Sequence, residues 1–398
     1  LGILIFIDDY FNCLTVGSVM RPVTDRHQIS RPKLAYLIDA TAAPVCMIAP
    51  ISSWAAAVSS TAEDLDTGIS GLQLFIRAIP YNFYSLLTFV FIITLTLLKF
   101  DYGPMRGFEE RARNTGDLSG SAGSTEENAN PKGRVIDLVI PVIMLIILCT
   151  IGMLYVGGFF GADTSGCTDY AGDFIGAFGN TDAFVGLPWG GIIALVLTVI
   201  YLVARRVVGF REAMGCIPKG FQAMISPIII LTLAVSLKTT LNALGAADYV
   251  HDLMYAASEG LYNMLPAVIF LVACVLAFAS GTSWGTFGIL IPIVSAIFPS
   301  DSALLCIGIS ACCAGAVCGD HCSPISDTSI MASAGAHCSH VNHVSTQLPY
   351  AITAAVISAV CYVVTGLSQM FLGASASLLT SLVLLAVAIV LELVVLNV

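Results

Sequence analysis

The chain has 398 residues, of which 57% are hydrophobic and only 11% are charged, and its mean hydropathy is +0.90. A soluble domain of this length cannot bury so much apolar surface, so the composition excludes that class. The formal net charge of −10 is not by itself evidence about a partner, and the sequence carries no basic footprint for nucleic acid. The composition therefore predicts an all-α polytopic protein embedded in the lipid bilayer.

Apolar stretches long enough to cross a bilayer recur along the chain, since about 20 residues span the hydrocarbon core. We count about ten membrane-crossing or broken segments. Of the 16 Lys and Arg residues, 14 lie in three loops (21–33, 99–134 and 205–219), and the alternate loops carry acids instead. Because basic loops favour the cytoplasm, this alternation predicts a serpentine chain. The chain begins inside an apolar run at Leu1, which we interpret as a form that lacks an N-terminal portion.

The two ends of the chain align without a gap at an offset of 311 residues, which places Asp9, Asn12 and Thr15 on Asp320, Ser323 and Ser326. The segments that follow the two copies have opposite predicted orientations, as in transporters built from inverted repeats. The predicted organisation is the remainder of a first inverted repeat (1–100), a cytoplasmic linker (101–134), middle transmembrane helices (135–245) and a second inverted repeat (246–398).

Polar residues and glycines interrupt three of the apolar stretches, at residues 5–15, Ser280–Thr286 and Asp320–Thr328. Unwound backbone at membrane depth is tolerated only where protein buries it or where it lines a cavity. The sequence therefore predicts broken or re-entrant helices at these places. An alternative for the second stretch is helix packing, because Gly281 and Gly285 have small-xxx-small spacing.

The third break carries the most specific chemistry. Ser323 followed by Pro324 predicts an N-cap and the first residue of a half-helix, with Asp327 in its first turn. Asp320 is then expected in the unwound stretch just before it. Intramembrane carboxylates indicate function, and carboxylate and hydroxyl oxygens are the hard ligands that alkali cations prefer. The same carboxylates can take a proton when the cation leaves, so one site would exchange the two ions.

The candidate residues fall into three groups. The predicted ion- and proton-binding residues are Asp320, Asp327, Ser323, Ser326, Thr328, Asp9, Asn12, Thr15 and Asp8, the last of which could equally cap a helix at the interface. The predicted lining of the facing break is Ser280, Gly281, Thr282, Ser283 and Thr286. The second-rank candidates are Asp39, Lys238 and His321, because a single charge in a span can also pair structurally or snorkel.

Four metal-ligand types cluster at His337, Cys338, His340 and His343, beside Cys322 and His321. Their spacing fits no standard zinc pattern. We expect a polar external loop or a pH-responsive gate here, with metal binding as the weaker alternative.

Several of these runs resemble the signature segments of the NhaC family of sodium/proton antiporters. They are Gly319–Thr328, Ser280–Gly288, His343–Tyr350 and Asp8–Asn12. The resemblance implies a multi-pass antiporter of the bacterial inner membrane, with Na⁺ and H⁺ as transported substrates, no cofactor, and homodimerisation left open. The family also contains members that exchange malate for lactate, so an organic acid could travel too.

Two other hypotheses remain at this point. A sodium-coupled organic-acid carrier would need a cation to meet its substrate, and Lys238 and Arg77 are the intramembrane candidates. An intramembrane hydrolase would use Ser323 or His321, but the sequence lacks a nucleophile elbow.

Overall fold

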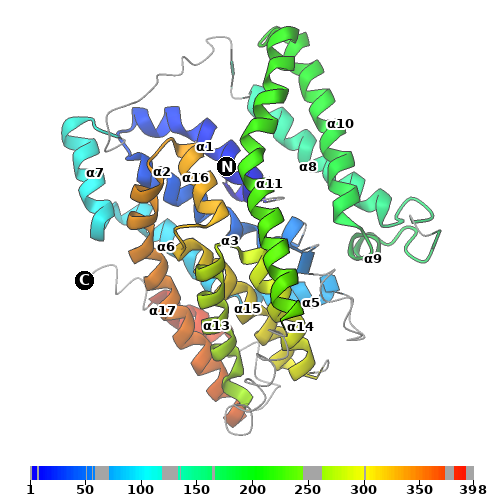
Figure 1. The fold of residues 1–398 in the computed structure, drawn as a ribbon, viewed down its shortest axis with the longest axis vertical. Helices are drawn as coiled ribbons and strands as arrows, with labels where there is room; N and C mark the ends of the chain where they lie inside the picture. The colour runs from blue at the N-terminus through cyan, green and yellow to red at the C-terminus, as the bar shows by residue number, and fades with distance from the viewer. Residues whose placement is uncertain are drawn as a thin grey trace. The chain divides into compact units, whose positions relative to one another are not determined.

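The computed structural model describes residues 2–6, 9–50, 52–55, 57–58, 71–118, 133–134, 136–163, 166–244, 262–299, 302–372 and 381–390. Every regular element within these ranges is helical (Figure 1). The predicted all-α class is therefore confirmed.

The α-helices are α1 (Asp9–Arg26), α2 (Arg31–Asp39), α3 (Ala43–Cys46), α5 (Gly71–Ala78), α6 (Phe83–Leu98), α7 (Gly103–Thr115), α8 (Ile136–Val156), α9 (Phe174–Gly179), α10 (Ala183–Ala204), α11 (Phe210–Ala243), α13 (Leu265–Ser280), α14 (Ser283–Ile297), α15 (Ala303–Cys322), α16 (Asp327–Ala336) and α17 (His340–Leu372). Three short 3₁₀ turns are η1 (Gly2–Leu4), η2 (Ile79–Tyr81) and η3 (Tyr262–Met264). Residues 381–390 form one more short helix.

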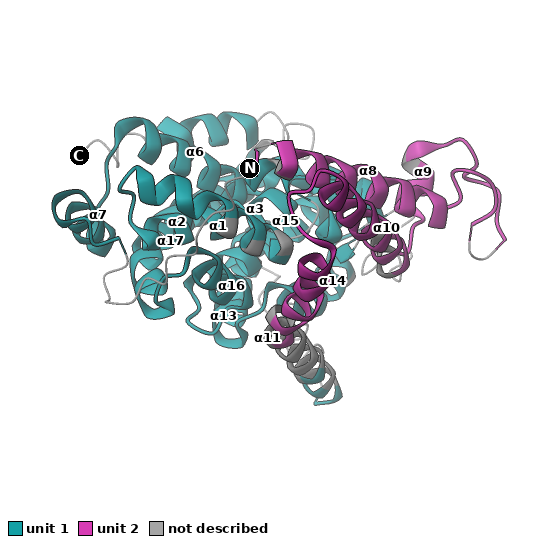
Figure 2. Ribbon diagram, turned by 90° about the horizontal axis from the view of Figure 1, so that it is seen from above, with its two compact units in different colours: residues 1–123, 233–398 teal, residues 124–232 magenta. Residues whose placement is uncertain are grey.

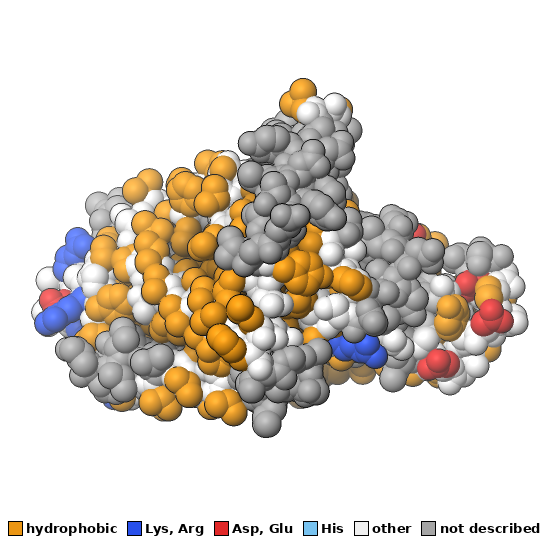
Figure 3. Space-filling model, turned by 90° about the horizontal axis from the view of Figure 1, so that it is seen from below, with side chains coloured by type: hydrophobic (Ala, Val, Ile, Leu, Met, Phe, Trp, Pro, Cys, Tyr) orange, Lys and Arg blue, Asp and Glu red, His pale blue; other side chains and the backbone are white. Residues whose placement is uncertain are grey.

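Five helical stretches among the described residues are long and apolar enough to cross a membrane: Phe83–Thr115, Val139–Val156, Tyr262–Ser280, Ala303–Cys322 and His340–Phe371. Three shorter apolar helices accompany them, at Pro188–Ala204, Ser283–Ser295 and Ser381–Val390. Hydrophobic side chains also cover much of the face drawn in Figure 3. Helices of this length and composition make the chain a multi-pass membrane protein.

The chain divides into two compact units (Figure 2), and one of the two boundaries between them along the chain lies inside α11. Unit 1 comprises residues 1–123 and 233–398, and unit 2 comprises residues 124–232. In unit 2, α8 and α10 pack closely because glycines remove the intervening side chains: a Cβ on Gly190 would lie 2.5 Å from the Cα of Cys149. Small residues at such contacts are typical of helix pairs in membranes.

In unit 1, helix α15 packs along α13, and α16 packs against α1 and α2. The crossing of α1 and α16 is a contact between glycines: a Cβ on Gly17 would lie 2.5 Å from the carbonyl carbon of Gly335. A Cβ on Gly335 would in turn lie 2.6 Å from the carbonyl oxygen of Cys13. No other residue type permits this approach without a backbone shift, so the glycines fix where the two helices touch.

Part of the predicted linker 101–134 is ordered helix. Helix α7 buries Met105, Glu109 and Ala112 on one face. The ammonium of Lys33 lies 2.6 Å from a carboxylate oxygen of Asp101, whose other oxygen accepts the Tyr350 hydroxyl at 2.9 Å. These contacts attach the segment to unit 1. Residues 119–132 of the predicted linker lie outside the described residues.

Candidate functional site

Helices α15 and α16 are two halves of one broken segment. Helix α15 ends at Cys322, residues 323–326 are non-helical, and α16 begins at Asp327. The cap of α16 is Ser326, whose Oγ accepts the Ser329 N–H at 3.2 Å. The predicted break is confirmed, but the prediction that Ser323 caps the second half is wrong. Ser323 instead ends α15, and its hydroxyl donates to the carbonyl of Phe278 at 2.8 Å.

Asp320 and Asp327 are both buried and lie on opposite sides of the break. Asp320 belongs to the last turn of α15 rather than to unwound backbone, because α15 continues to Cys322. Its Oδ2 accepts the Thr328 hydroxyl at 3.0 Å, which joins it to the first turn of α16. Its Oδ1 has no hydrogen-bond partner among the described residues. A buried acceptor without a donor is costly and favours a bound cation or proton.

Asp327 is held by two donors. The Tyr10 hydroxyl on α1 donates to Oδ2 at 2.6 Å, and the Thr328 N–H donates to Oδ1 at 2.7 Å. The position of Asp327 at the start of α16 also favours its ionised form, because helix N-termini carry partial positive charge. Tyr10 was not a predicted site residue, although it directly follows the acidic pair of Asp8 and Asp9 in the sequence.

The break between α13 and α14 lies next to the start of α16. The Gly281 carbonyl accepts the Asp327 N–H at 3.4 Å, and Gly281 has a φ of +65°, in the region that favours glycine. The hydroxyls of this break bond to backbone groups and do not approach the carboxylates. Those of Ser280, Ser283 and Thr286 donate to the carbonyls of Leu276, Ala316 and Thr282, respectively. The Thr282 hydroxyl accepts the Gly285 N–H and so caps α14. These side chains therefore shape the break.

The N-terminal candidates take different places. Asp9 is buried at the first residue of α1, and Asn12 is buried one turn later. The Asn12 amide nitrogen lies 2.9–3.0 Å from the carbonyls of Gly2, Ile5 and Thr41, and its two hydrogens are shared among them, so it closes irregular backbone ahead of α1 and after α2. Thr15 is only partly buried in α1, and Asp8 lies outside the described residues.

Asp39 proves central to a second buried polar group. It is the last residue of α2, where a break of three residues separates α2 from α3. Its Oδ2 accepts from the Ser329 hydroxyl at 2.7 Å, the Gln347 amide at 2.7 Å and His343 Nε2 at 3.2 Å. His321 Nε2 lies 3.9 Å from its Oδ1, while His321 Nδ1 contacts the Tyr84 hydroxyl at 3.0 Å.

Sequence reasoning missed Gln347 and missed this role of His343. Both lie on α17 and are almost fully buried. The signal was their spacing of four residues, which places two polar side chains on one face of a helix.

The prediction of an external loop around the histidines is wrong in part, because His340 and His343 belong to α17 and His343 is buried. His340 Nε2 contacts the Pro324 carbonyl at 2.7 Å. Among the described residues, no group of three or more His, Cys, Asp or Glu side chains could hold a metal ion. Metal binding at this cluster therefore has no geometric support.

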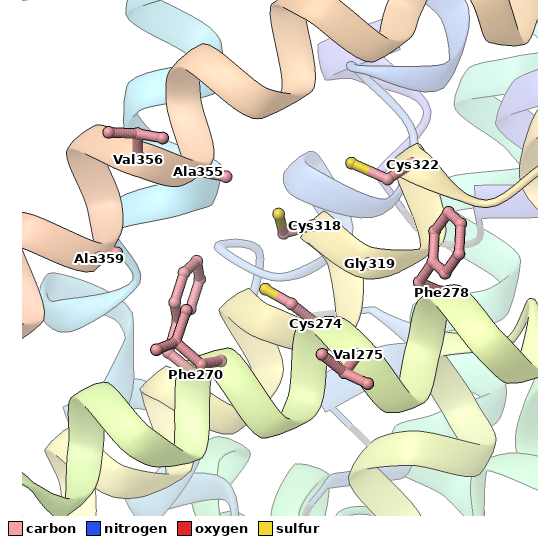
Figure 4. A pocket seen from close by; sticks show the side chains of 11 residues that line it. Phe270, Cys274, Val275, Phe278, Cys318, Gly319, Cys322, Ala355, Val356 and Ala359 are labelled. Carbon is pink, nitrogen blue, oxygen red and sulfur yellow. The ribbon is translucent and has the colours of Figure 1, made fainter.

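A pocket of about 310 Å³ lies between α13, α15 and α17, beside Cys274, Cys318 and Cys322 (Figure 4). The labelled side chains that line it are apolar or thiol-bearing, and none is an acid. This pocket lacks the oxygen ligands that an alkali cation needs, so the carboxylates of the helix break are the better candidates.

Comparison with known proteins agrees with this chemistry. A family model described as "Na+/H+ antiporter family" matches residues 59–367. The chain belongs to the Na+/H+ antiporter family. The resemblance to the NhaC family is thereby confirmed, and with it the assignment to membrane-embedded antiporters.

Two curated relatives are similar to this family member. An uncharacterised protein of Haemophilus influenzae is 35% identical over 391 residues, which is 96% of this chain and 73% of the relative. The "Malate-2H(+)/Na(+)-lactate antiporter" of Bacillus subtilis is 28% identical over 201 residues, or 49% of this chain and 42% of the relative. No solved structure matches.

The family is one of transporters, and the geometry of Ser323 fits that assignment. The Ser323 hydroxyl donates to a backbone carbonyl and accepts the Ile325 N–H at 3.3 Å. His321 instead faces Tyr84 and Asp39. The two residues named for a hydrolase are therefore engaged separately, each in holding helices together.

Proposed function

We propose that this chain exchanges Na⁺ for H⁺ across the bacterial inner membrane, with Asp320 and Asp327 as the ion-binding carboxylates. The observation that carries the proposal is the pair of buried carboxylates on either side of one helix break, one of which has an oxygen that no described residue hydrogen-bonds. Family membership supports the choice of ions.

The charges around the pair support competition between a cation and protons. Among the described residues, the side chains that contact Asp320 and Asp327 are hydroxyls, and no Lys or Arg forms an ion pair with either. Two ionised carboxylates buried without a counter-charge are strongly unfavourable. A sodium ion relieves the repulsion directly, and protonation relieves it when sodium is absent. Occupancy by one ion therefore excludes the other, which is the requirement for exchange.

Neutral oxygens complete the proposed site. Thr328 Oγ1 donates to Asp320 Oδ2 at 3.0 Å, and Ser326 Oγ lies 3.2 Å from Thr328 Oγ1, so two neutral oxygens gather at this carboxylate. Ser323, Asp9, Asn12 and Thr15 stay as further candidates. Asp9 and Asn12 enter from α1, which packs on α16.

Inverted repeats and about ten membrane segments belong to the same proposal. Helix α1 begins at Asp9 and α16 begins at Asp327, an offset of 318 rather than 311 residues. At this offset Gly17 corresponds to Gly335, the residue that it touches. We therefore favour the register of 318, in which α1 and α16 are equivalent half-helices that start with an aspartate and cross at a glycine.

The deciding variant is Asp327→Asn. Asparagine has nearly the same shape as aspartate but cannot carry the charge or exchange the proton, so we expect sodium-driven proton movement to fall at least about a hundredfold. The measurement is proton flux in proteoliposomes on addition of sodium, followed with a trapped pH-sensitive dye. The matched control is Asp117→Asn, because Asp117 is exposed after α7. Wild-type exchange in Asp327→Asn would refute the proposed site.

A sodium-coupled organic-acid antiporter is the second candidate, favoured by the name of the Bacillus subtilis relative. Such a carrier needs a cation to meet the substrate carboxylate. Arg77 is exposed on α5, and Lys238 lies on α11 with a side chain outside the described residues. Counterflow of labelled malate or lactate separates the two functions, because simple sodium/proton exchange requires neither acid.

A further inference from the structure

The side-chain amide of Gln347 joins the two halves of the broken helix. Its Nε2 donates to the backbone carbonyl of His321, in the last turn of α15, at 3.0 Å. The same nitrogen donates to Asp39 Oδ2 at 2.7 Å. An amide nitrogen carries two hydrogens, so both are used.

Asp39 extends this connection to α16. Its Oδ2 also accepts the hydroxyl of Ser329, which lies in the first turn of α16, at 2.7 Å. An unbroken path of hydrogen bonds therefore runs from the end of α15 through Gln347, Asp39 and Ser329 to the start of α16. We call these three side chains the clamp.

The clamp is protected from water. Asp39 and Ser329 are 0% exposed and Gln347 is 1% exposed. Hydrogen bonds to a buried charged acceptor are stronger than those between neutral groups, and water cannot replace them here. The clamp is therefore a firm connection, and His343 Nε2 supports it with a further bond to Asp39 at 3.2 Å.

The two ends of the clamp adjoin the two carboxylates of the proposed site. His321 directly follows Asp320, and Ser329 lies two residues after Asp327. Neither Gln347 nor Asp39 contacts Asp320 or Asp327 through a hydrogen bond in the structure. Asp39 also acts on the two carboxylates through its charge, but Gln347 and Ser329 are neutral, so these two can act on the ion only by setting how far apart the carboxylates are held.

We propose that Gln347 and Asp39 are positioning residues that determine which alkali cation the antiporter prefers. A rigid cavity discriminates between cations by its size and ligand placement, whereas a flexible one does not. Loosening the clamp lets α15 and α16 separate, so the site accepts larger cations. This inference rests on the proposed function, because it presumes that Asp320 and Asp327 bind the cation.

The test compares Gln347→Met with Gln369→Met in proteoliposomes. Methionine keeps the length of glutamine and removes both donors. Gln369 lies on the same helix, and its amide nitrogen has no partner among the described residues, so it is the matched control. Proton flux is measured against Li⁺, Na⁺ and K⁺ to give kcat and KM for each. We expect the kcat/KM ratio of K⁺ to Na⁺ to rise about tenfold in Gln347→Met and to stay unchanged in the control.

Ser329→Ala breaks the clamp at its other end and should shift the ratio in the same direction. It guards against a folding failure of Gln347→Met, and the thermal midpoint of each purified variant reports folding directly. An unchanged cation ratio in the folded variants overturns the inference, even if kcat falls, because a merely structural role predicts that result. Absence of sodium-driven flux in the wild type would instead overturn the proposed function.

Discussion

Helices α15 of unit 1 and α8 of unit 2 have similar lengths and are both apolar enough to span a membrane, but their surroundings are opposite. Within the most apolar part of α15, 89% of the residues are buried, whereas the corresponding share in α8 is 28%. Along α8, Ile143, Ile147 and Ile151 recur at a spacing of four residues and are all exposed. This spacing presents an apolar stripe to lipid. Both helices are apolar enough to cross a membrane, so that criterion does not show which one protein surrounds; the polar residues at the end of α15 do.

The comparison shows where buried polarity is tolerated. Helix α15 carries Asp320 and His321 at a break that neighbouring helices enclose. Helix α8 has its one acid, Asp137, in its first turn, where Arg205 and Tyr201 meet it. Charge at membrane depth needs partners or a function, while charge near a helix end needs neither to the same degree.

The ion pairs of the two units offer the largest expected difference in stability. The carboxylates of both pairs are buried, at 4% exposed for Asp101 and 6% for Asp137, but the Lys33 side chain is 11% exposed whereas that of Arg205 is 36% exposed. Lys33→Met leaves a buried carboxylate without its cation, so we expect a loss of about 3 kcal/mol in the free energy of unfolding. Chemical unfolding in detergent measures it.

Two further variants test the cause. Lys33→Met with Asp101→Asn should regain part of the loss, since the buried charge is gone. Arg205→Met should cost clearly less than Lys33→Met. Equal losses in the two units would show that burial does not distinguish the pairs.

The glycine contacts predict an intermediate effect. Gly335→Ala places a Cβ against the backbone of α1, so the helices must shift, at a cost of about 2 kcal/mol. A Cβ on Gly191, in α10 of unit 2, meets nothing within 4 Å. Gly191→Ala should therefore be neutral or slightly stabilising, because alanine favours helix. The thermal midpoints of both variants measure these two effects. A midpoint of Gly335→Ala at the wild-type value would contradict the close contact between α1 and α16.

The smallest expected effect is a pH dependence in unit 2. The hydrogen bond from Arg205 lowers the pKa of Asp137. A carboxylate with a lowered pKa stabilises the folded protein above its usual pKa, near 4, and this contribution disappears as the pH falls. The thermal midpoint of Asp137→Asn should therefore lie slightly below that of the wild type at pH 7, and the difference should shrink as the pH falls below 4. A difference of the same size at both pH values would assign the effect to packing.

The sequence was sufficient for the class of protein and for two of the helix breaks. Long apolar runs identify membrane helices, and Gly, Ser and Pro within them mark where backbone must leave the helix. The cap was misplaced because Ser323-Pro324 and Ser326-Asp327 are both acceptable helix starts by local rules. Only the packing of Ser323 against the Phe278 carbonyl decides between them.

The clamp could not be predicted for a related reason. Gln347 and Asp39 are 308 residues apart, and their contact depends on how α2 and α17 pack in unit 1. Isolated polar residues in apolar helices indicate that a partner exists but do not identify it. The carboxylate pair was more accessible to prediction, because Asp320 and Asp327 lie seven residues apart on the two sides of one break.

The contact between Gly17 and Gly335 has a mechanical consequence. At most helix interfaces, interdigitated side chains resist a change in the crossing angle. At a glycine–glycine contact no side chains interdigitate, so the crossing angle can change more easily. We expect α1 and α16 to stay in contact at these two glycines while the angle between the helices changes. Tyr10 and Asp327 lie about two helical turns from the glycine contact. A modest change in the crossing angle would therefore form or break the hydrogen bond between them.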